Sequence, residues 1–217
     1  MCSARIDTFK NNVDEWLLTR QVSLPGWLFQ EKHGNSVGKT DNISMILMDT
    51  KEIAISKMKQ LFGEDNKRID HALKVLRFSE EILQGENITG KIAETVMLTA
   101  ILHDIGIHEA ERKYNSNLGT YQEIEGPPIA KRMLREMGIR NRTIERVCYI
   151  IGGHHTPSKI DDVDFQILWE ADLLVNIEES GLMKDKNVNL RTIISKNFKT
   201  ATGKRIAETL YTDRPST

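Results

Sequence analysis

The spacing of apolar residues constrains this chain more than any other feature of its sequence. From Ile43 onward, apolar side chains recur every three or four positions, and no convincing run alternates between apolar and polar residues. The first pattern is typical of helices that bury one face, whereas half-buried strands would need the second. The sequence therefore predicts an all-helical fold, and 217 residues are enough to build one well-formed core.

Capping and breaking residues divide this pattern into segments. The first body helix is expected from Ile43 to Gly63, and the next from Asp65 or Asn66 to about Gln84, stopped by Gly85. The later helices are expected, in order, at 91–104, at "EGPPIAKRMLREMG" with its prolines in the first turn and Gly138 at its end, at 143–153, at 161–179, and once or twice beyond Arg191.

Two stretches fall outside this helical pattern. Residues 105–126 are expected to form a long loop with a weak helical piece at 108–113, and loops of that length in a compact domain are often functional. Residues 1–42 are expected to be an N-terminal extension ahead of a single domain at 43–213. Three aromatic side chains of the extension are available to dock it on that domain, namely Trp16, Trp27 and Phe29.

Composition narrows the classes of function. The net charge of −1 gives no basic surface for long nucleic acids, and no segment approaches the roughly 18 apolar residues of a membrane span. The N-terminus also lacks the apolar core of a signal peptide. Two cysteines, Cys2 and Cys148, are too few for a disulfide framework and are expected to be free thiols. We expect a cytoplasmic protein, and its oligomeric state is open.

One short stretch, "TAILHDIGI", places polar residues where the helical pattern calls for apolar ones. His103 follows Ile92, Val96 and Ala100 along one face of its expected helix, and Asp104 comes directly after it. A single histidine on such a face is more often a hydrogen-bonded core residue than a metal ligand. Its meaning therefore depends on whether other helices show the same feature.

Three other helices do show it. His71 begins the apolar stripe of the second helix, and His154 and His155, in "GGHHTP", continue the inward face of the helix before them. Asp172 lies midway along the stripe of the 161–179 helix, where burying an unpaired carboxylate would cost several kcal/mol. A shared cation explains the whole set, because imidazole nitrogens and carboxylate oxygens then satisfy one charge together.

The order of His71, then His103 and Asp104, then Asp172 in a helical chain resembles the H…HD…D pattern of the HD superfamily of metal-dependent phosphohydrolases. The resemblance covers about 43–211 and implies an HD-type bundle of about six to eight helices. It also implies that these four residues hold a first divalent metal ion, with His103 and Asp104 as the catalytic pair.

The resemblance extends to a second metal. Two-metal members of the superfamily hold another ion through further histidines and the motif aspartate, here Asp104, and His154 and His155 match that part of the pattern. Where those relatives carry a histidine before the proline-containing helix, this chain has Glu125, which is a competent oxygen ligand. One or two divalent ions are therefore expected, with Mn, Fe, Mg, Co, Ni and Zn all open.

The reaction implied is hydrolysis of a phosphomonoester or phosphodiester by a metal-activated water. The expected partner is a small phosphorylated substrate, a nucleotide being one candidate. With a single metal, Glu109 or Glu125 would position or deprotonate the water. Arg112 and Lys113 are candidates to bind the substrate phosphate, although "EAERK" also reads as an ordinary solvated helix surface.

Two other functions are open at the level of sequence. An HD-type di-iron oxygenase would use a similar set of histidines and carboxylates, and a non-catalytic HD domain would bind a nucleotide as a sensor. A P-loop is not indicated, because "HGNSVGKT" has His33 where the G-x-x-x-x-G-K-[ST] motif needs glycine.

Overall fold

The computed structural model of the chain describes residues 40–184 and 188–212, and this part is helical throughout. Its nine α-helices and two short 3-10 helices, with no strand among the described residues, confirm the all-helical prediction. The expected docking of Trp16, Trp27 and Phe29, the fate of Cys2 and the "HGNSVGKT" stretch ahead of Thr40 lie outside the described residues.

The helices follow one another along the chain with short connections. Their bounds are α2 (Thr40–Phe62), α3 (Asn66–Gly85), α4 (Gly90–Leu102), α5 (Ile107–Tyr114), α6 (Gly119–Glu136), α7 (Asn141–Ile151), η1 (Pro157–Lys159), α8 (Val163–Glu179), η2 (Leu182–Lys184), α9 (Leu190–Asn197) and α10 (Ala201–Tyr211).

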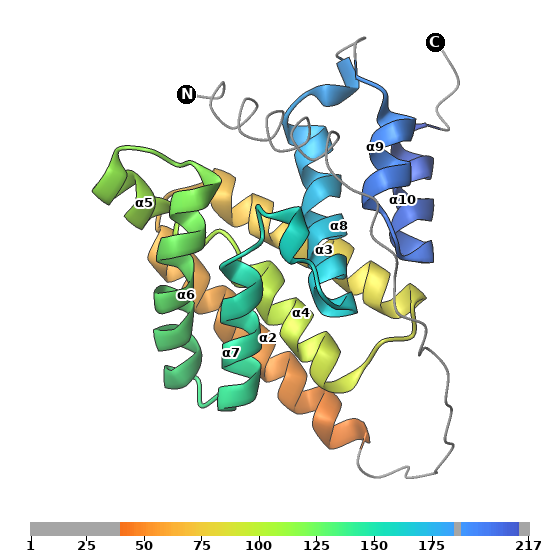
Figure 1. The fold of residues 1–217 in the computed structure, drawn as a ribbon. Coiled ribbons are helices and arrows are strands. Elements are labelled where there is room, and N and C mark those ends of the chain that lie inside the picture. The colour runs from red at the N-terminus through yellow and green to blue at the C-terminus, as the bar shows by residue number, and fades with distance from the viewer. Residues whose placement is uncertain (1–39, 185–187, 213–217) are drawn as a thin grey trace.

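Helix α4 lies at the centre of the bundle, where it packs against α2, α3, α7 and α8. Its sequence explains this position, because most of its residues are apolar and eight of its thirteen are buried. The α5–α6 pair lies at one side of the molecule and the α9–α10 pair at the opposite side (Figure 1). No described helix has the length and apolar character needed to cross a membrane.

Several expected helix boundaries are confirmed. The side chain of Asp65 accepts a hydrogen bond from the backbone N–H of Arg68 and caps α3, which ends at Gly85. The expected helix at 161–179 is α8, and the side chain of Asp162 caps it by accepting a hydrogen bond from the backbone N–H of Val163. Along α4 the buried stripe begins one turn later than expected, because Ile92 in its first turn is 42% exposed.

The expected long loop at 105–126 is wrong. Helix α5 and the first half of α6 occupy most of it, and only residues 115–118 connect the two. The two prolines, Pro127 and Pro128, consequently lie inside α6 rather than in its first turn. Their fixed φ is compatible with a helix, and packing of α6 along α7 compensates for the backbone hydrogen bonds that proline cannot donate.

The corner between α4 and α5 requires glycine for a reason that the sequence pattern did not reveal. A Cβ on Gly106 would lie 2.4 Å from the backbone nitrogen of Gly126 and 2.9 Å from the carbonyl oxygen of Gln122. Gly106 therefore does more than end a helix. Its missing side chain allows the backbone of α6 to lie directly against the turn that carries His103 and Asp104.

Candidate metal centre

Side chains from three regions of the chain converge beside the end of α4. His71 comes from α3, His103 and Asp104 follow the last turn of α4, and His154 and His155 follow α7. All except His155 are at most 6% exposed. Their potential ligand atoms form two groups that share Asp104, and within each group these atoms lie within 4.8 Å of one another.

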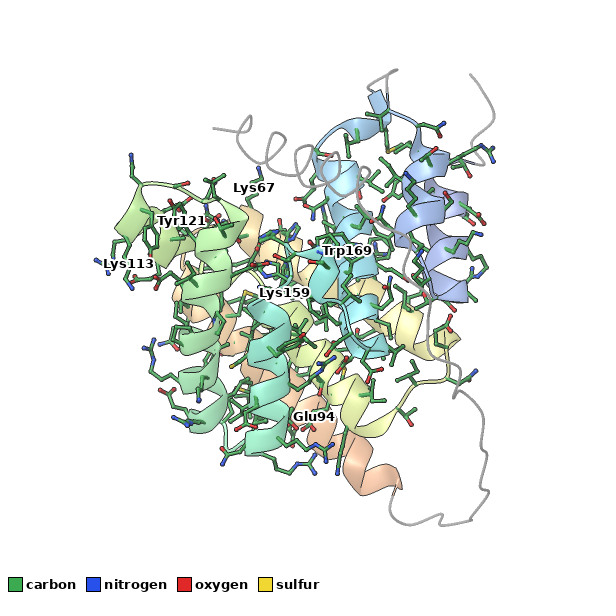
Figure 2. The ribbon with its side chains drawn as sticks, viewed as in Figure 1. Lys67, Glu94, Lys113, Tyr121, Lys159 and Trp169 are labelled. Carbon is green, nitrogen blue, oxygen red and sulfur yellow. The ribbon has the colours of Figure 1, made fainter. Side chains whose placement is uncertain are left out.

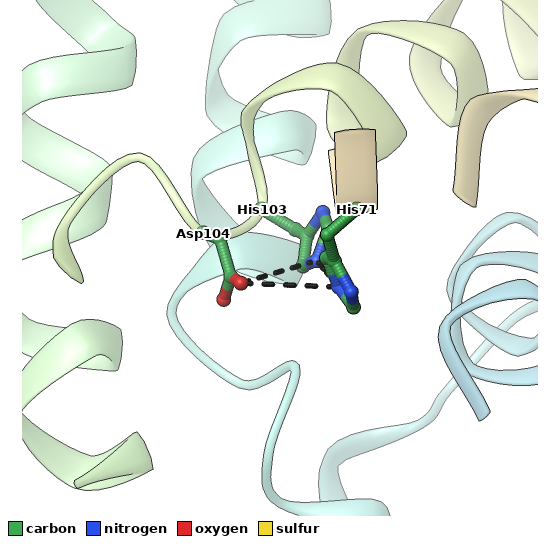
Figure 3. A group of neighbouring side chains, drawn as sticks. All are labelled: His71, His103 and Asp104. Carbon is green, nitrogen blue, oxygen red and sulfur yellow. Dashed lines mark hydrogen bonds and ion pairs between the residues drawn. The ribbon is translucent and has the colours of Figure 1, made fainter. Parts of the chain in front are cut away.

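The first ligand set consists of His71, His103, Asp104 and Asp172. Nε2 of His71 lies 3.2 Å from Nε2 of His103 and 3.1 Å from Oδ1 of Asp172. Oδ2 of Asp104 lies 3.8 Å from both imidazole Nε2 atoms (Figure 3). Asp172 Oδ1 is also 3.6 Å from Nε2 of His103. Two imidazole nitrogens and two carboxylate oxygens thus face a common point.

The hydrogen bonds behind these rings determine which nitrogen carries the proton. Nδ1 of His71 donates to Oε2 of Glu179 at 3.1 Å, and Nδ1 of His103 donates to the carbonyl of Ala100 at 2.9 Å. When each imidazole is neutral, its Nε2 therefore carries no proton and has a free lone pair. Without a cation, Nε2 of His71 can instead carry a proton toward Asp172. A divalent cation between the two Nε2 atoms, which lie 3.2 Å apart, would displace that proton and satisfy both lone pairs.

The second ligand set consists of Asp104, His154 and His155. Nδ1 of His154 donates to the carbonyl of Ile151 at 2.7 Å, so Nε2 of the neutral ring also has a free lone pair. This buried nitrogen has no hydrogen-bond partner among the described residues, and Oδ1 of Asp104 lies 3.5 Å from it. Buried polar atoms in folded proteins nearly always have a hydrogen-bond partner, so this nitrogen is suited to coordinate a metal ion.

His155 is held in place by the beginning of α6. Its backbone N–H donates to Oε1 of Glu123 at 2.9 Å, and its Nε2 lies 3.4 Å from Oε1 of Gln122. A Cβ on Gly119 would lie 2.5 Å from the imidazole ring, so this glycine leaves the space that the ring fills. The ring also packs on that of His154, with 3.9 Å between their centroids.

The pKa values of these groups shift in opposite directions, depending on whether burial or a neighbouring carboxylate has the larger effect. Burial by itself lowers the pKa of His71, but hydrogen bonds to Asp172 and Glu179 outweigh burial and raise this pKa to about 10. Burial by itself raises the pKa of Asp172, yet the bond from His71 brings it to about 2. Burial and the neighbouring His154 lower the pKa of His155 to about 3. The carboxylates thus stabilise positive charge at His71 and His154, whereas burial lowers the pKa of His103 and His155.

Four residues named from the sequence lie away from this centre, namely Glu109, Arg112, Lys113 and Glu125. The carboxylate of Glu125 accepts hydrogen bonds from Nζ of Lys113 at 2.7 Å and from the hydroxyl of Tyr114 at 2.9 Å. Arg112 forms a two-bonded pair with Glu109, at 2.6 and 2.8 Å.

These charged residues of the α5–α6 pair line a cavity of about 460 Å³ that no member of either ligand set lines. Lys113 lies on the outer side of that pair (Figure 2). The structure thus gathers six of the predicted ligands and leaves Glu109, Arg112, Lys113 and Glu125 elsewhere.

Three residues near the centre were not predicted from the sequence, namely Gln122, Glu123 and Glu179. Gln122 and Glu123 fell in the stretch expected to be a loop, so no helical face drew attention to them. Glu179 had a usable signal, because it follows Asp172 by seven residues, or two helical turns, and so lies on the same face of α8.

Comparison with known proteins agrees with this geometry. The sequence matches the HD domain family over residues 68–197, which is more than half of the chain and contains both ligand sets. No curated protein and no solved structure matches the chain. The buried cluster of histidines and aspartates fits a divalent metal site of the HD type. The chain therefore belongs to the HD domain family.

Proposed function

We propose that this protein is a metal-dependent phosphohydrolase that cleaves a phosphomonoester or phosphodiester of a small molecule. One observation carries the proposal: the Nε2 atoms of His71, His103 and His154 all face the carboxylate of Asp104. Membership of the HD family supports the same class of reaction, since metal-dependent hydrolysis is typical of that family.

Some side chains of the centre would bind the metal ion, and others orient the side chains that bind it. A divalent cation bound here would lower the pKa of a coordinated water and offset negative charge on a phosphoryl group. His71, His103, Asp104 and Asp172 would hold this ion. The hydrogen bonds to Ala100 and Glu179 fix the rings that carry the nitrogen ligands, which limits reorganisation during the reaction.

We further propose that a second ion binds more weakly than the first. The first ligand set contains two carboxylates, whose combined charge matches one divalent ion. The second set shares Asp104 and has no carboxylate of its own, because Glu125 is bound to Lys113 and Tyr114. A second ion would therefore depend on His154, His155 and the anionic substrate for its remaining contacts.

The proposed substrate is a small phosphorylated molecule, with a nucleotide as one candidate. The metal centre supports this class better than the flanking cations do. Arg112 and Lys113 are both ion-paired, so contact with a phosphate would require them to leave Glu109 and Glu125.

The test combines metal analysis with hydrolysis assays. Elemental analysis of the purified full-length chain is followed by assays on phosphomonoesters, phosphodiesters and nucleotides, with Mn, Mg, Fe, Co, Ni and Zn added separately. We expect wild type to retain metal and to hydrolyse at least one ester. Asp104→Ala should lose both properties, whereas the exposed Asp70→Ala, next to a ligand in sequence, should keep both.

Three outcomes would contradict the proposal. Full metal content and full activity in Asp104→Ala would remove the metal centre from the reaction. Iron with oxygen consumption and no ester hydrolysis would favour the oxygenase. Thermal stabilisation by nucleotides without turnover would favour a sensor.

A further inference from the structure

The carboxylate of Glu179 lies behind the first ligand set rather than in it. Glu179 is the last residue of α8, and its side chain is 20% exposed. Oε2 lies 3.1 Å from Nδ1 of His71, and Oε1 lies 3.3 Å from Nζ of Lys74. One face of α8 thus presents two carboxylates to the same imidazole ring, because Asp172 Oδ1 lies 3.1 Å from Nε2 of His71.

The hydrogen-bond partner of His71 differs from those of the other histidines with an identified Nδ1 bond. His103 and His154 donate to neutral backbone carbonyls, of Ala100 and Ile151. His71 donates to a carboxylate, and a negative acceptor increases the electron density at the opposite nitrogen. We therefore expect His71 to be the strongest nitrogen ligand of the centre.

We propose that Glu179 is a positioning residue that holds His71 in the Nδ1–H tautomer and thereby sets the metal affinity of the first ligand set. Lys74 balances the charge of this carboxylate, which lets it remain ionised in a half-buried position. This inference rests on the proposed function only in requiring that a divalent ion binds the centre.

The test measures metal affinity in matched variants. Glu179→Gln keeps the shape and an acceptor oxygen but removes the charge, and the exposed neighbour Glu178→Gln provides the control. Calorimetric titration of the metal-free full-length chain with Mn²⁺ should show affinity about 10- to 100-fold weaker in Glu179→Gln, the usual effect of removing such a partner. Glu178→Gln should bind as wild type does. Equal affinity in wild type and Glu179→Gln overturns the inference.

A second measurement separates positioning from a merely structural role and needs no variant that could fail to fold. Long-range ¹H–¹⁵N spectra of the wild type loaded with Zn²⁺ should show His71 with Nδ1 protonated and Nε2 bound to the metal. A His71 ring bound to the metal through Nδ1, with its proton on Nε2, would overturn the inference. If wild type binds no divalent ion at all, the proposed function fails as well, whereas binding with unchanged affinity in Glu179→Gln removes only the role of Glu179.

Discussion

The two ligand sets share Asp104 but are built in different ways. The first draws its side chains from α3, from the end of α4 and from α8, so it exists only when three separate helices are packed together. The second adds two consecutive histidines from the segment after α7 and is positioned by the beginning of α6. The first set has two carboxylates and an imidazole that donates to a third carboxylate, Glu179. The second set has only the shared Asp104, and hydrogen bonds and close packing hold its two imidazoles in place.

The largest expected effect is on the first ligand set. Asp172→Ala removes one of its two carboxylates and leaves His71 and His103 with lone pairs that face each other. We expect metal-dependent thermal stabilisation to disappear and hydrolysis to fall by more than the 10- to 100-fold typical of residues behind a ligand. Retained stabilisation by Mn²⁺ in this variant would mean that Asp172 is not a ligand.

The next effect separates the two sets. His154→Gln removes the buried Nε2 that has no hydrogen-bond partner in the described part of the chain, and leaves the first set intact. We expect one tightly bound ion to remain and hydrolysis to fall by about 10- to 100-fold. Metal stoichiometry after gel filtration measures this directly, and loss of all bound metal would erase the proposed difference between the sets.

A smaller effect tests how close packing at Gly119 positions His155 in the second set. Gly119→Ala places a methyl group where the His155 ring lies, and such overpacking costs about 1–3 kcal/mol of stability. Hydrolysis should fall while the tight ion is retained. The adjacent exposed Thr120→Ala serves as the control in thermal melts and in assays. Wild-type behaviour of Gly119→Ala would show that His155 is free to move.

The smallest effect concerns Glu125. Because its carboxylate is bound to Lys113 and Tyr114, Glu125→Gln should leave metal stoichiometry unchanged. The cost in stability should be about 1 kcal/mol or less, since Lys113 is 41% exposed. A lower metal content in this variant would bring Glu125 back as a ligand and make the two sets more alike.

Sequence reasoning worked where one physical rule dominated. Caps at Asp65 and Asp162 marked helix starts because side-chain capping is local. The polar residues on apolar stripes marked the first ligand set because burial of charge needs a strong compensating partner. Family membership then agreed with that interpretation.

The rest depended on tertiary contacts that spacing does not encode. Glycine and polar residues made 105–126 look like a loop, but α5 and the first half of α6 occupy most of it, and Gly106 and Gly126 allow the backbones to pack closely there. The same misreading hid Gln122 and Glu123. The partner of Glu125 could not be known before α5 was placed beside α6.

The orientation of Asp104 makes the occupancies of the two sets interdependent. One oxygen of this carboxylate faces His71 and His103, and the other faces His154. An ion bound to one oxygen withdraws electron density from the other oxygen and so weakens binding of an ion there. By thermodynamic reciprocity, each ion changes the affinity for the other by the same factor. A titration should accordingly show a second dissociation constant that varies with the element already bound, so that mixed-metal forms differ from either pure form.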